Sequence, residues 1–351
     1  MIKPLTSLRF FFAFCVFLSH LSYLKYDGRY KGIFENIFSE GFLGVSFFFI
    51  LSGFILALNY RDKFKNKNIS LKKFYIARFA RIYPLYFFTM LVSIPTFYSS
   101  LKILFCNILL IQSYIPDQLY FFSYNAPSWS ISDEMFFYAL FPFLIGIGFK
   151  FSKVLKIVLL ITFIALLLVL NNLLPEEKIH YWLYISPFTR IFDFILGILL
   201  FEIALYLKRK KTLHKKSFIF LEIGALSILV LSFICHLYVP ISYRFSIYYW
   251  LPMCLIILSA ANSYISESNI TWFTKFLSWK WFVYLGEISF GFYLIHYLVI
   301  TYTQKYNGLI GIQLNGIPLA LLMFFITLIA SIFAYEAIEK PFNKKLKNLF
   351  S

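Results

Sequence analysis

The chain has 351 residues, of which 60% are hydrophobic, 22% aromatic and only 14% charged. About a quarter of the residues of an ordinary soluble domain are charged, so this composition excludes that class. Repeated apolar runs of helical length predict a polytopic α-helical membrane protein. The formal net charge of +17 does not imply nucleic acid here, because basic loop residues fix the topology of a membrane protein.

Ten segments are predicted to span the membrane as helices. In chain order they are 6–22, 41–60, 74–95, 130–148, 157–173, 187–206, 217–238, 249–265, 284–303 and 314–337. A shorter apolar stretch lies at 101–115. If this stretch crossed, the basic run at 208–216 and the basic C-terminus would move to the outer side, against the positive-inside rule. We therefore predict a short re-entrant or interfacial helix near 101–115, on the outer side.

The chain is expected to form one membrane-embedded domain, 1–351, with no appended soluble domain. Both termini are predicted to be cytoplasmic, because the basic residues then gather on the inner side of the membrane. The composition, rich in lysine and phenylalanine, and the lack of an organelle signal favour a bacterial inner membrane.

The first predicted span carries an ionisable residue near each end. Arg9 and His20 are eleven residues apart, which on a helix places both side chains on one face, with a rise of about 16 Å between them. Ionisable groups inside a spanning segment are costly and by default indicate function. The simpler alternatives are an arginine that snorkels to the cytoplasmic surface and a histidine at the level of the outer headgroups.

A second basic group begins the third predicted span. Arg78 and Arg81 are three residues apart and are therefore neighbours on one helix surface. They enter the membrane at the depth of Arg9, and three guanidiniums at one depth would bind phosphates. Helix anchoring explains these arginines equally well.

An acidic pair begins the fourth predicted span, at the level of His20. Asp133 and Glu134 either interact with the positive end of the helix dipole or supply a carboxylate that orients His20 as a base. The sequence leaves both interpretations open.

Other polar residues within the predicted spans carry weaker signals. Ser52 precedes Gly53 in the second span, where a small residue favours close helix packing. Arg190 and Asp193 are three residues apart and can pair with each other. His296 lies in the outer half of its span, where a single histidine is more often a packing residue. The four cysteines lie in apolar runs at unrelated spacings and predict no metal site.

Together these residues resemble the acyltransferase-3 family of membrane acyltransferases, which includes bacterial enzymes that O-acetylate lipopolysaccharide O-antigen and other surface glycans. The matches keep the family's order over nearly the whole chain. They are Arg9 and His20; Ser52, Gly53 and Phe54; Arg78, Arg81, Ile82 and Pro84; Trp129, Ser130, Ile131, Ser132, Asp133 and Glu134; Arg190, Phe194 and Gly197; Ser289, Gly291, Tyr293 and His296; and Glu339, Lys340 and Pro341. Asp133 departs from the family, which usually has an apolar residue there, so the alignment favours Glu134 as the acid that faces the site.

The resemblance implies an acyl-CoA donor, normally acetyl-CoA, and a glycan acceptor, free or lipid-linked. In this interpretation the three arginines bind the donor's phosphates, and His20 is the base that takes the proton of the acceptor hydroxyl, with Glu134 or Asp133 orienting it. An acetyl-His20 intermediate is the other route. The remaining candidate pocket residues are Ser52, Trp129, Ser130, Arg190, Tyr293 and His296.

Two other classes of protein compete with an acyltransferase. A transporter, such as a flippase of a lipid-linked glycan, often shows internal repeats and polar groups at the membrane midplane. No repeat is found here, and the ionisable residues gather near the ends of the spans. A scaffold without chemistry leaves the shared face of Arg9 and His20 unexplained.

Overall fold

The computed structural model describes residues 2–97, 99–210, 214–266, 270–307, 314–343 and 345, and over these ranges it contains helices and no strands. The chain divides into two compact units. Unit 1 comprises Met1–Leu8, Val45–Leu71 and Phe136–Val283, and unit 2 comprises Arg9–Gly44, Lys72–Met135 and Tyr284–Ser351. The single membrane domain over 1–351 stays a prediction. Parts of the basic run 208–216 and of the C-terminal tail lie outside the described residues.

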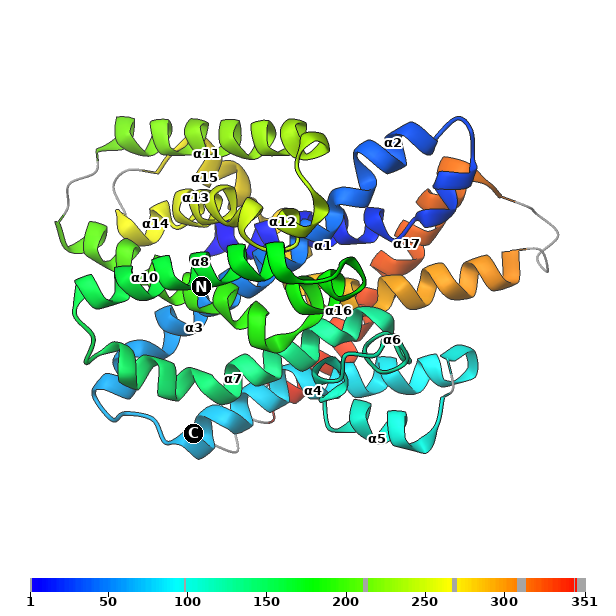
Figure 1. Ribbon diagram of the computed structural model, residues 1–351, viewed down its shortest axis with the longest axis horizontal. Helices are drawn as coiled ribbons and strands as arrows, with labels where there is room; N and C mark the ends of the chain where they lie inside the picture. Colours follow the sequence, from blue (N-terminus) through cyan, green and yellow to red (C-terminus); the bar gives the residue numbers. More distant parts are fainter. Residues whose placement is uncertain are drawn as a thin grey trace. The chain divides into compact units, whose positions relative to one another are not determined.

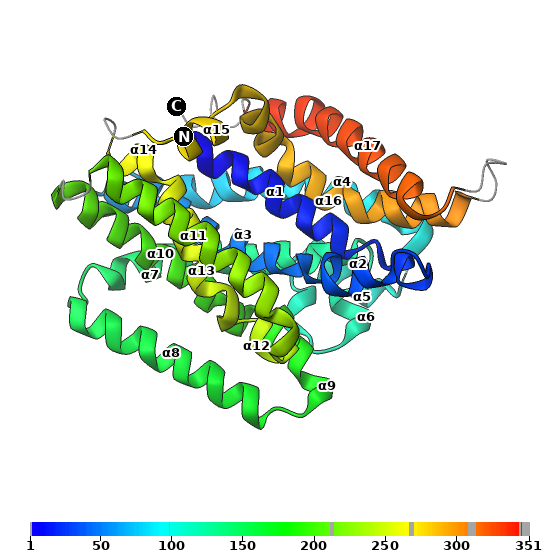
Figure 2. The ribbon, with the colours of Figure 1, turned by 90° about the horizontal axis from the view of Figure 1, so that it is seen from above.

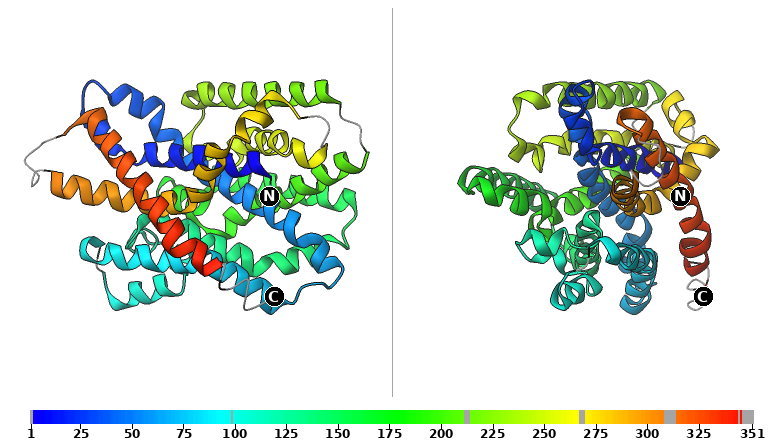
Figure 3. Two further views of the ribbon diagram at one scale, coloured as in Figure 1. Left: turned by 180° about the vertical axis from the view of Figure 1, so that it is seen from behind. Right: turned by 90° about the vertical axis from the view of Figure 1, so that its right-hand side faces the viewer.

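Unit 1 is a helical bundle in which α11 lies beside α13 (Figures 1 and 3) and α8 forms an outer helix (Figure 2). Its helices are most of α3 (Leu43–Lys65), most of α7 (Trp129–Gly148), α8 (Lys153–Leu173), α9 (Glu176–Ile179), α10 (Pro187–Lys210), α11 (Lys215–Cys235), α12 (Ile241–Arg244), α13 (Trp250–Ala260), α14 (Asn262–Ile265) and α15 (Trp272–Leu277). Helices α3 and α10 approach each other closely at two glycines, Gly53 and Gly197. A Cβ on Gly197 would lie 1.9 Å from the Ile50 carbonyl oxygen, and a Cβ on Gly53 would lie 2.0 Å from the Phe194 carbonyl oxygen, so that no larger residue fits at either position. The packing interpretation of Gly53 is therefore confirmed.

Unit 2 contains the elements that carry most of the candidate site residues. Its helices are most of α1 (Lys3–Ser19), α2 (Lys31–Asn36), most of α4 (Leu71–Phe97), α5 (Leu101–Ile108), α6 (Gln118–Phe121), the first turns of α7, most of α16 (Lys280–Tyr306), α17 (Gly316–Ala334) and a π-helical segment, Tyr335–Glu339. Aromatic rings join α1, α16 and α17, which lie side by side in Figure 2. Phe17 lies 5.8 Å from Phe292 and 6.1 Å from Phe324, measured between ring centroids.

Each of the ten predicted spans coincides with a helix, but the count of ten crossings is not confirmed. Six described stretches are long and apolar enough to cross a membrane: Lys31–Lys65, Ala126–Gly148, Lys153–Leu173, Lys215–Tyr238, Lys280–Tyr306 and Gly316–Asn343. Helices α1 and α13 have 17 and 11 residues, so they extend about 26 and 17 Å, short of a hydrocarbon core of about 30 Å. Helices α4 and α10 have 27 and 24 residues but carry several charged side chains, and they are not among these six stretches. The all-α membrane class is confirmed.

The stretch at 101–115 contains the eight-residue helix α5 and a 3-10 turn at Gln112–Tyr114. An eight-residue helix rises about 12 Å and cannot cross the bilayer. Buried hydroxyl contacts hold the following turn against the start of α7, because the Ser113 Oγ donates to the Ser132 Oγ at 2.7 Å and Ser132 donates to the Leu110 carbonyl oxygen at 2.6 Å. The structure therefore has a short helix here and no eleventh spanning helix.

Candidate active site

His20 lies immediately after α1, in contact with α16. Helix α1 ends at Ser19, and the His20 backbone N–H donates to the Phe17 carbonyl oxygen at 3.1 Å. The predicted helical span extends past this point, so the helix is shorter than expected. The His20 Nδ1 lies 2.8 Å from the Val16 carbonyl oxygen and 3.3 Å from the Nε2 of His296. The structure thus makes His296, a predicted pocket residue, a direct neighbour of His20.

For neutral imidazoles, the hydrogen-bond partners of His20 and His296 indicate which ring nitrogen carries the proton. A carbonyl oxygen only accepts, so the nitrogen facing it must carry the proton. The His296 Nδ1 donates to the Tyr293 carbonyl oxygen at 2.6 Å, which leaves a lone pair on its Nε2. The His20 Nδ1–H is shared between this lone pair and the Val16 carbonyl oxygen. The Nε2 of His20 is then unprotonated, and no hydrogen bond to it is found among the described residues, so it has the form that a general base needs.

Tyr293 joins His296 to the start of α7. Its hydroxyl lies 2.8 Å from the Ser130 Oγ and 3.1 Å from the Pro127 carbonyl oxygen. The same hydroxyl is within electrostatic reach of Asp133 and Glu134. Predicted pocket residues from two distant segments therefore meet in unit 2.

The two predicted acids differ in exposure. Asp133 is fully buried, whereas Glu134 is half-buried. Trp129, in the same first turns of α7, is buried as well. The structure places the rings of His296 and Tyr297 against His20, with centroids 5.0 and 5.2 Å away, and the assignment of Glu134 or Asp133 to orient the base stays a prediction.

The second cluster forms around the predicted arginines of unit 2. The Arg81 Nη1 lies 2.8 Å from the Glu339 Oε2, and these side chains are 27% and 1% exposed. Arg9 is within electrostatic reach of the same carboxylate. A Cβ on Gly291 would lie 3.5 Å from the Glu339 Oε1, in ordinary van der Waals contact, so this glycine lies beside the acid. Two of the three predicted arginines thus gather around one buried carboxylate.

Arg78 lies one turn before Arg81 on α4 and is half-buried. The sequence did not reveal the contact of Glu339 with Arg81. Glu339 is one of the residues that match the family, but the sequence alone assigned it no role. The available signal was a carboxylate at the end of the last apolar segment, in a chain whose arginines were predicted to enter the membrane near one surface.

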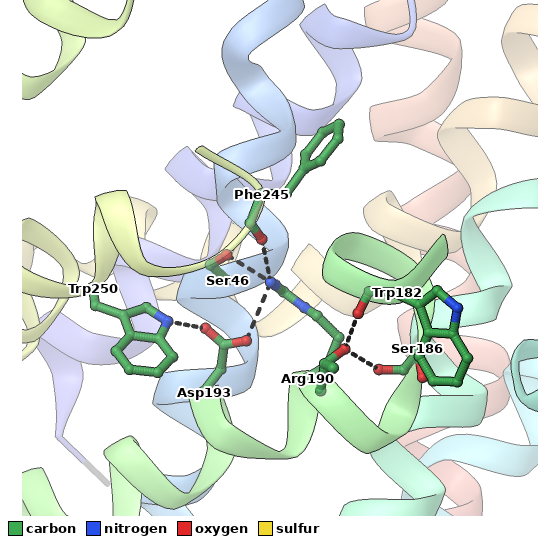
Figure 4. Close-up of polar contacts among 8 residues, drawn as sticks. Ser46, Trp182, Ser186, Arg190, Asp193, Phe245 and Trp250 are labelled. Atoms are coloured by element: carbon green, nitrogen blue, oxygen red, sulfur yellow. Dashed lines mark hydrogen bonds and ion pairs between the residues drawn. The ribbon is translucent and has the colours of Figure 1, made fainter. Parts of the chain in front are cut away.

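Arg190 is a buried member of a network within unit 1 (Figure 4). It is 1% exposed, and its Nη1 lies 3.2 Å from the Asp193 Oδ2 and donates to the Phe245 carbonyl oxygen at 2.6 Å. Its Nη2 donates to the Ser46 Oγ at 2.8 Å. The Trp250 Nε1 donates to the Asp193 Oδ1 at 2.6 Å. The expected pairing of Arg190 with Asp193 is confirmed, and the membership of Arg190 in a catalytic pocket stays a prediction.

Ser52 also belongs to unit 1. It is half-buried on α3, next to the close crossing at Gly53. Its membership of a catalytic pocket stays a prediction. Among the residues that the structure describes, no group of three or more His, Cys, Asp or Glu side chains is arranged to hold a metal ion.

Unit 2 therefore contains a histidine nitrogen to which no hydrogen bond is found among the described residues, and two arginines near a buried carboxylate. The sequence profile of the acyltransferase domain family matches residues 3–336. The chain belongs to this family and is an acyltransferase, which confirms the resemblance drawn from the motifs.

Several characterised proteins are similar to the chain. The acyltransferase MdmB of Streptomyces mycarofaciens is 27% identical over 97% of this chain and 91% of its own length. The O-acetyltransferase OatA of Staphylococcus aureus is 27% identical over 88% of this chain, and the peptidoglycan O-acetyltransferase OatA of Listeria monocytogenes is 26% identical over 87%. The matches cover only 53% and 51% of these two OatA proteins. No solved structure matches the chain significantly.

Proposed function

We propose that the chain is a membrane-bound O-acyltransferase that moves an acetyl group from cytoplasmic acetyl-CoA to a hydroxyl of a cell-envelope or surface glycan. The observation that carries this proposal is that the His20 Nδ1 faces the Val16 carbonyl oxygen and His296, which leaves Nε2 as the nitrogen available to act as a base. The names of the OatA relatives support an acetyl group and a glycan acceptor. Other acyl groups, and a lipid-linked or lipopolysaccharide acceptor, use the same chemistry.

In the direct route, the Nε2 of His20 takes the proton of the acceptor hydroxyl as its oxygen attacks the thioester carbonyl. The new ester C–O bond forms, the C–S bond breaks, and the CoA thiolate recovers the proton from the imidazolium. The hydrogen bonds from Nδ1 to the Val16 carbonyl oxygen and to His296 strengthen when the ring becomes cationic. In the covalent route, Nε2 attacks the thioester carbonyl, the C–S bond breaks and the CoA thiolate leaves, which gives acetyl-His20. The acceptor hydroxyl then attacks this acetyl group, the ester C–O bond forms as the bond to Nε2 breaks, and the CoA thiolate takes the hydroxyl proton.

The donor's phosphates would bind the cluster of Arg9, Arg78 and Arg81. In this proposal Glu339 is a positioning residue that holds the Arg81 guanidinium at 2.8 Å and keeps it oriented before the donor arrives. The helical rise from Arg9 to His20, about 16 Å, is comparable to the reach of an extended pantetheine arm. The thioester would then lie near His20 while the phosphates stay at the basic cluster.

We further propose a multi-pass protein of the bacterial inner membrane with both termini in the cytoplasm. The positive-inside rule supports this orientation, since it places the strongly basic segments on the side where acyl-CoA is found. The arginine cluster would then face the cytoplasmic supply of donor.

The test is transfer of label from acetyl-CoA to glycan in membranes that contain the protein. We expect His20→Ala to reduce transfer by about 10²- to 10⁴-fold, the usual contribution of a general base, whereas His214→Ala, at an exposed position before α11, serves as the matched control. Arg78→Ala and Arg81→Ala should weaken donor binding. Full transfer by the His20 variant at normal membrane insertion would remove it from the mechanism. Glycan translocation without label transfer would favour a transporter.

A further inference from the structure

Unit 1 contains a cavity that the proposed reaction does not use. Its volume is about 170 Å³, and it lies between α7, α8 and α10. The lining is almost wholly apolar and includes Ile147, Leu160 and Phe163. Lys156 and Glu202 are its only charged lining residues. An apolar cavity of this kind suits a hydrocarbon ligand with a polar end.

The two charged lining residues differ in their partners. The carboxylate of Glu202 accepts from Arg61, at 2.5 Å from Nε and 3.5 Å from Nη2, so its charge is balanced. Lys156 has no carboxylate within 4.0 Å among the residues that the structure describes. Lys153, one turn earlier on α8, lies with its Nζ 5.1 Å from the centroid of the Tyr206 ring. The start of α8 therefore carries excess positive charge beside an apolar cavity.

Helix α8 is exposed along the face that turns away from the cavity. Val154, Ile157 and Ile161 are 71%, 58% and 60% exposed, as expected for a helix surrounded by lipid. Farther along α8, Phe163 stacks on Phe192 of α10 with 4.5 Å between ring centroids. The helix is thus held to α10 at this ring pair, while the cavity occupies the space toward its basic start.

We propose that this cavity binds an acyl chain of an anionic phospholipid, whose headgroup phosphate is held by Lys156 and Lys153. The apolar lining of the cavity suits the apolar acyl chain of the lipid. The positive charge of the lysines suits the negative charge of its phosphate. A basic residue near a membrane surface contributes about 1 kcal/mol to the binding of an anionic lipid. The bound chain would fill the space between α8 and the rest of the bundle.

The test measures phospholipid bound to the purified, delipidated full chain by native mass spectrometry, with phosphatidylglycerol and phosphatidylcholine as probes. We expect one phosphatidylglycerol to be retained in preference to phosphatidylcholine. Lys156→Gln should weaken phosphatidylglycerol binding about fivefold, from the contribution of one lysine, and Lys156→Arg should restore it. The matched charge control is Lys178→Gln, at an exposed lysine of α9.

A second pair of variants tests the acyl-chain half of the site. Leu160→Trp places a large side chain in the cavity and should abolish the retained lipid, whereas Ile157→Trp, on the exposed face of the same helix, should leave it bound. Each variant is checked for folding by size-exclusion chromatography. Equal retention of the two phospholipids, or retention of phosphatidylglycerol by a folded Leu160→Trp variant, would overturn the proposal.

Discussion

His296 offers the sharpest test of the proposed catalytic arrangement, because it contacts the base without occupying the nitrogen that reacts. The replacement His296→Phe keeps an aromatic ring next to Phe17, whose centroid lies 6.4 Å from that of His296. It removes the lone pair that lies 3.3 Å from the His20 Nδ1. When His20 becomes cationic, this hydrogen bond is one to a charged group, worth about 1.5–3 kcal/mol. The Val16 carbonyl oxygen still accepts, so we expect the lower end, a loss of about tenfold in kcat.

The assay is steady-state transfer of labelled acetyl from acetyl-CoA, with kcat and KM determined separately. A positioning residue changes kcat and leaves the KM for the donor almost unchanged. His296→Gln is the matched control, because its amide oxygen again offers an acceptor and should recover much of the lost rate. A kcat of His296→Phe equal to that of the unmodified protein, or His296→Gln as slow as His296→Phe, would refute the reasoning.

Three further predictions concern other contacts. Glu339→Ala should raise the KM for acetyl-CoA about tenfold, because Arg81 loses a charge-assisted hydrogen bond. Glu339→Gln should recover much of the affinity, and an unchanged KM in the alanine variant would contradict the positioning role. Asp193→Leu leaves the guanidinium of Arg190 buried without its carboxylate and should cost about 3–5 kcal/mol in thermal unfolding in detergent, and the double variant with Arg190→Met should recover most of this loss. Gly197→Ala should destabilise the protein by about 1–3 kcal/mol or more in the same measurement. Gly224→Ala should not, because its Cβ would meet nothing within 4 Å. Similar effects of the two glycine variants would argue against the close approach of α3 and α10 at Gly197.

The sequence predicted the helices well because their apolar runs are long and each run is local. It also predicted a first helix that carries Arg9, but this helix ends at Ser19, so that His20 lies just beyond it. The contacts of these residues were not predictable in the same way. His20 and His296 are separated by 276 positions, and Arg81 and Glu339 by 258. Only the packing of the chain brings such pairs together.

The number of crossings stays open for a related reason. An apolar run predicts burial, and the interior of a protein and the interior of a bilayer both satisfy it. Helix α13 is only 11 residues long, and its apolar side chains include Met253 and Ile257, which are fully buried within the described structure. Hydropathy alone does not distinguish such a helix from a spanning one.

The contact between His20 and Val16 has a consequence for variation among related proteins. The atom that fixes the tautomer of His20 is a main-chain oxygen, and every amino acid provides one. Position 16 can therefore change its side chain without altering the proton on the imidazole, provided that the new side chain fits a site where valine is 1% exposed. Drift at this position among relatives would be compatible with unchanged chemistry, so sequence variability would not reveal that residue 16 contributes an atom to the proposed active site.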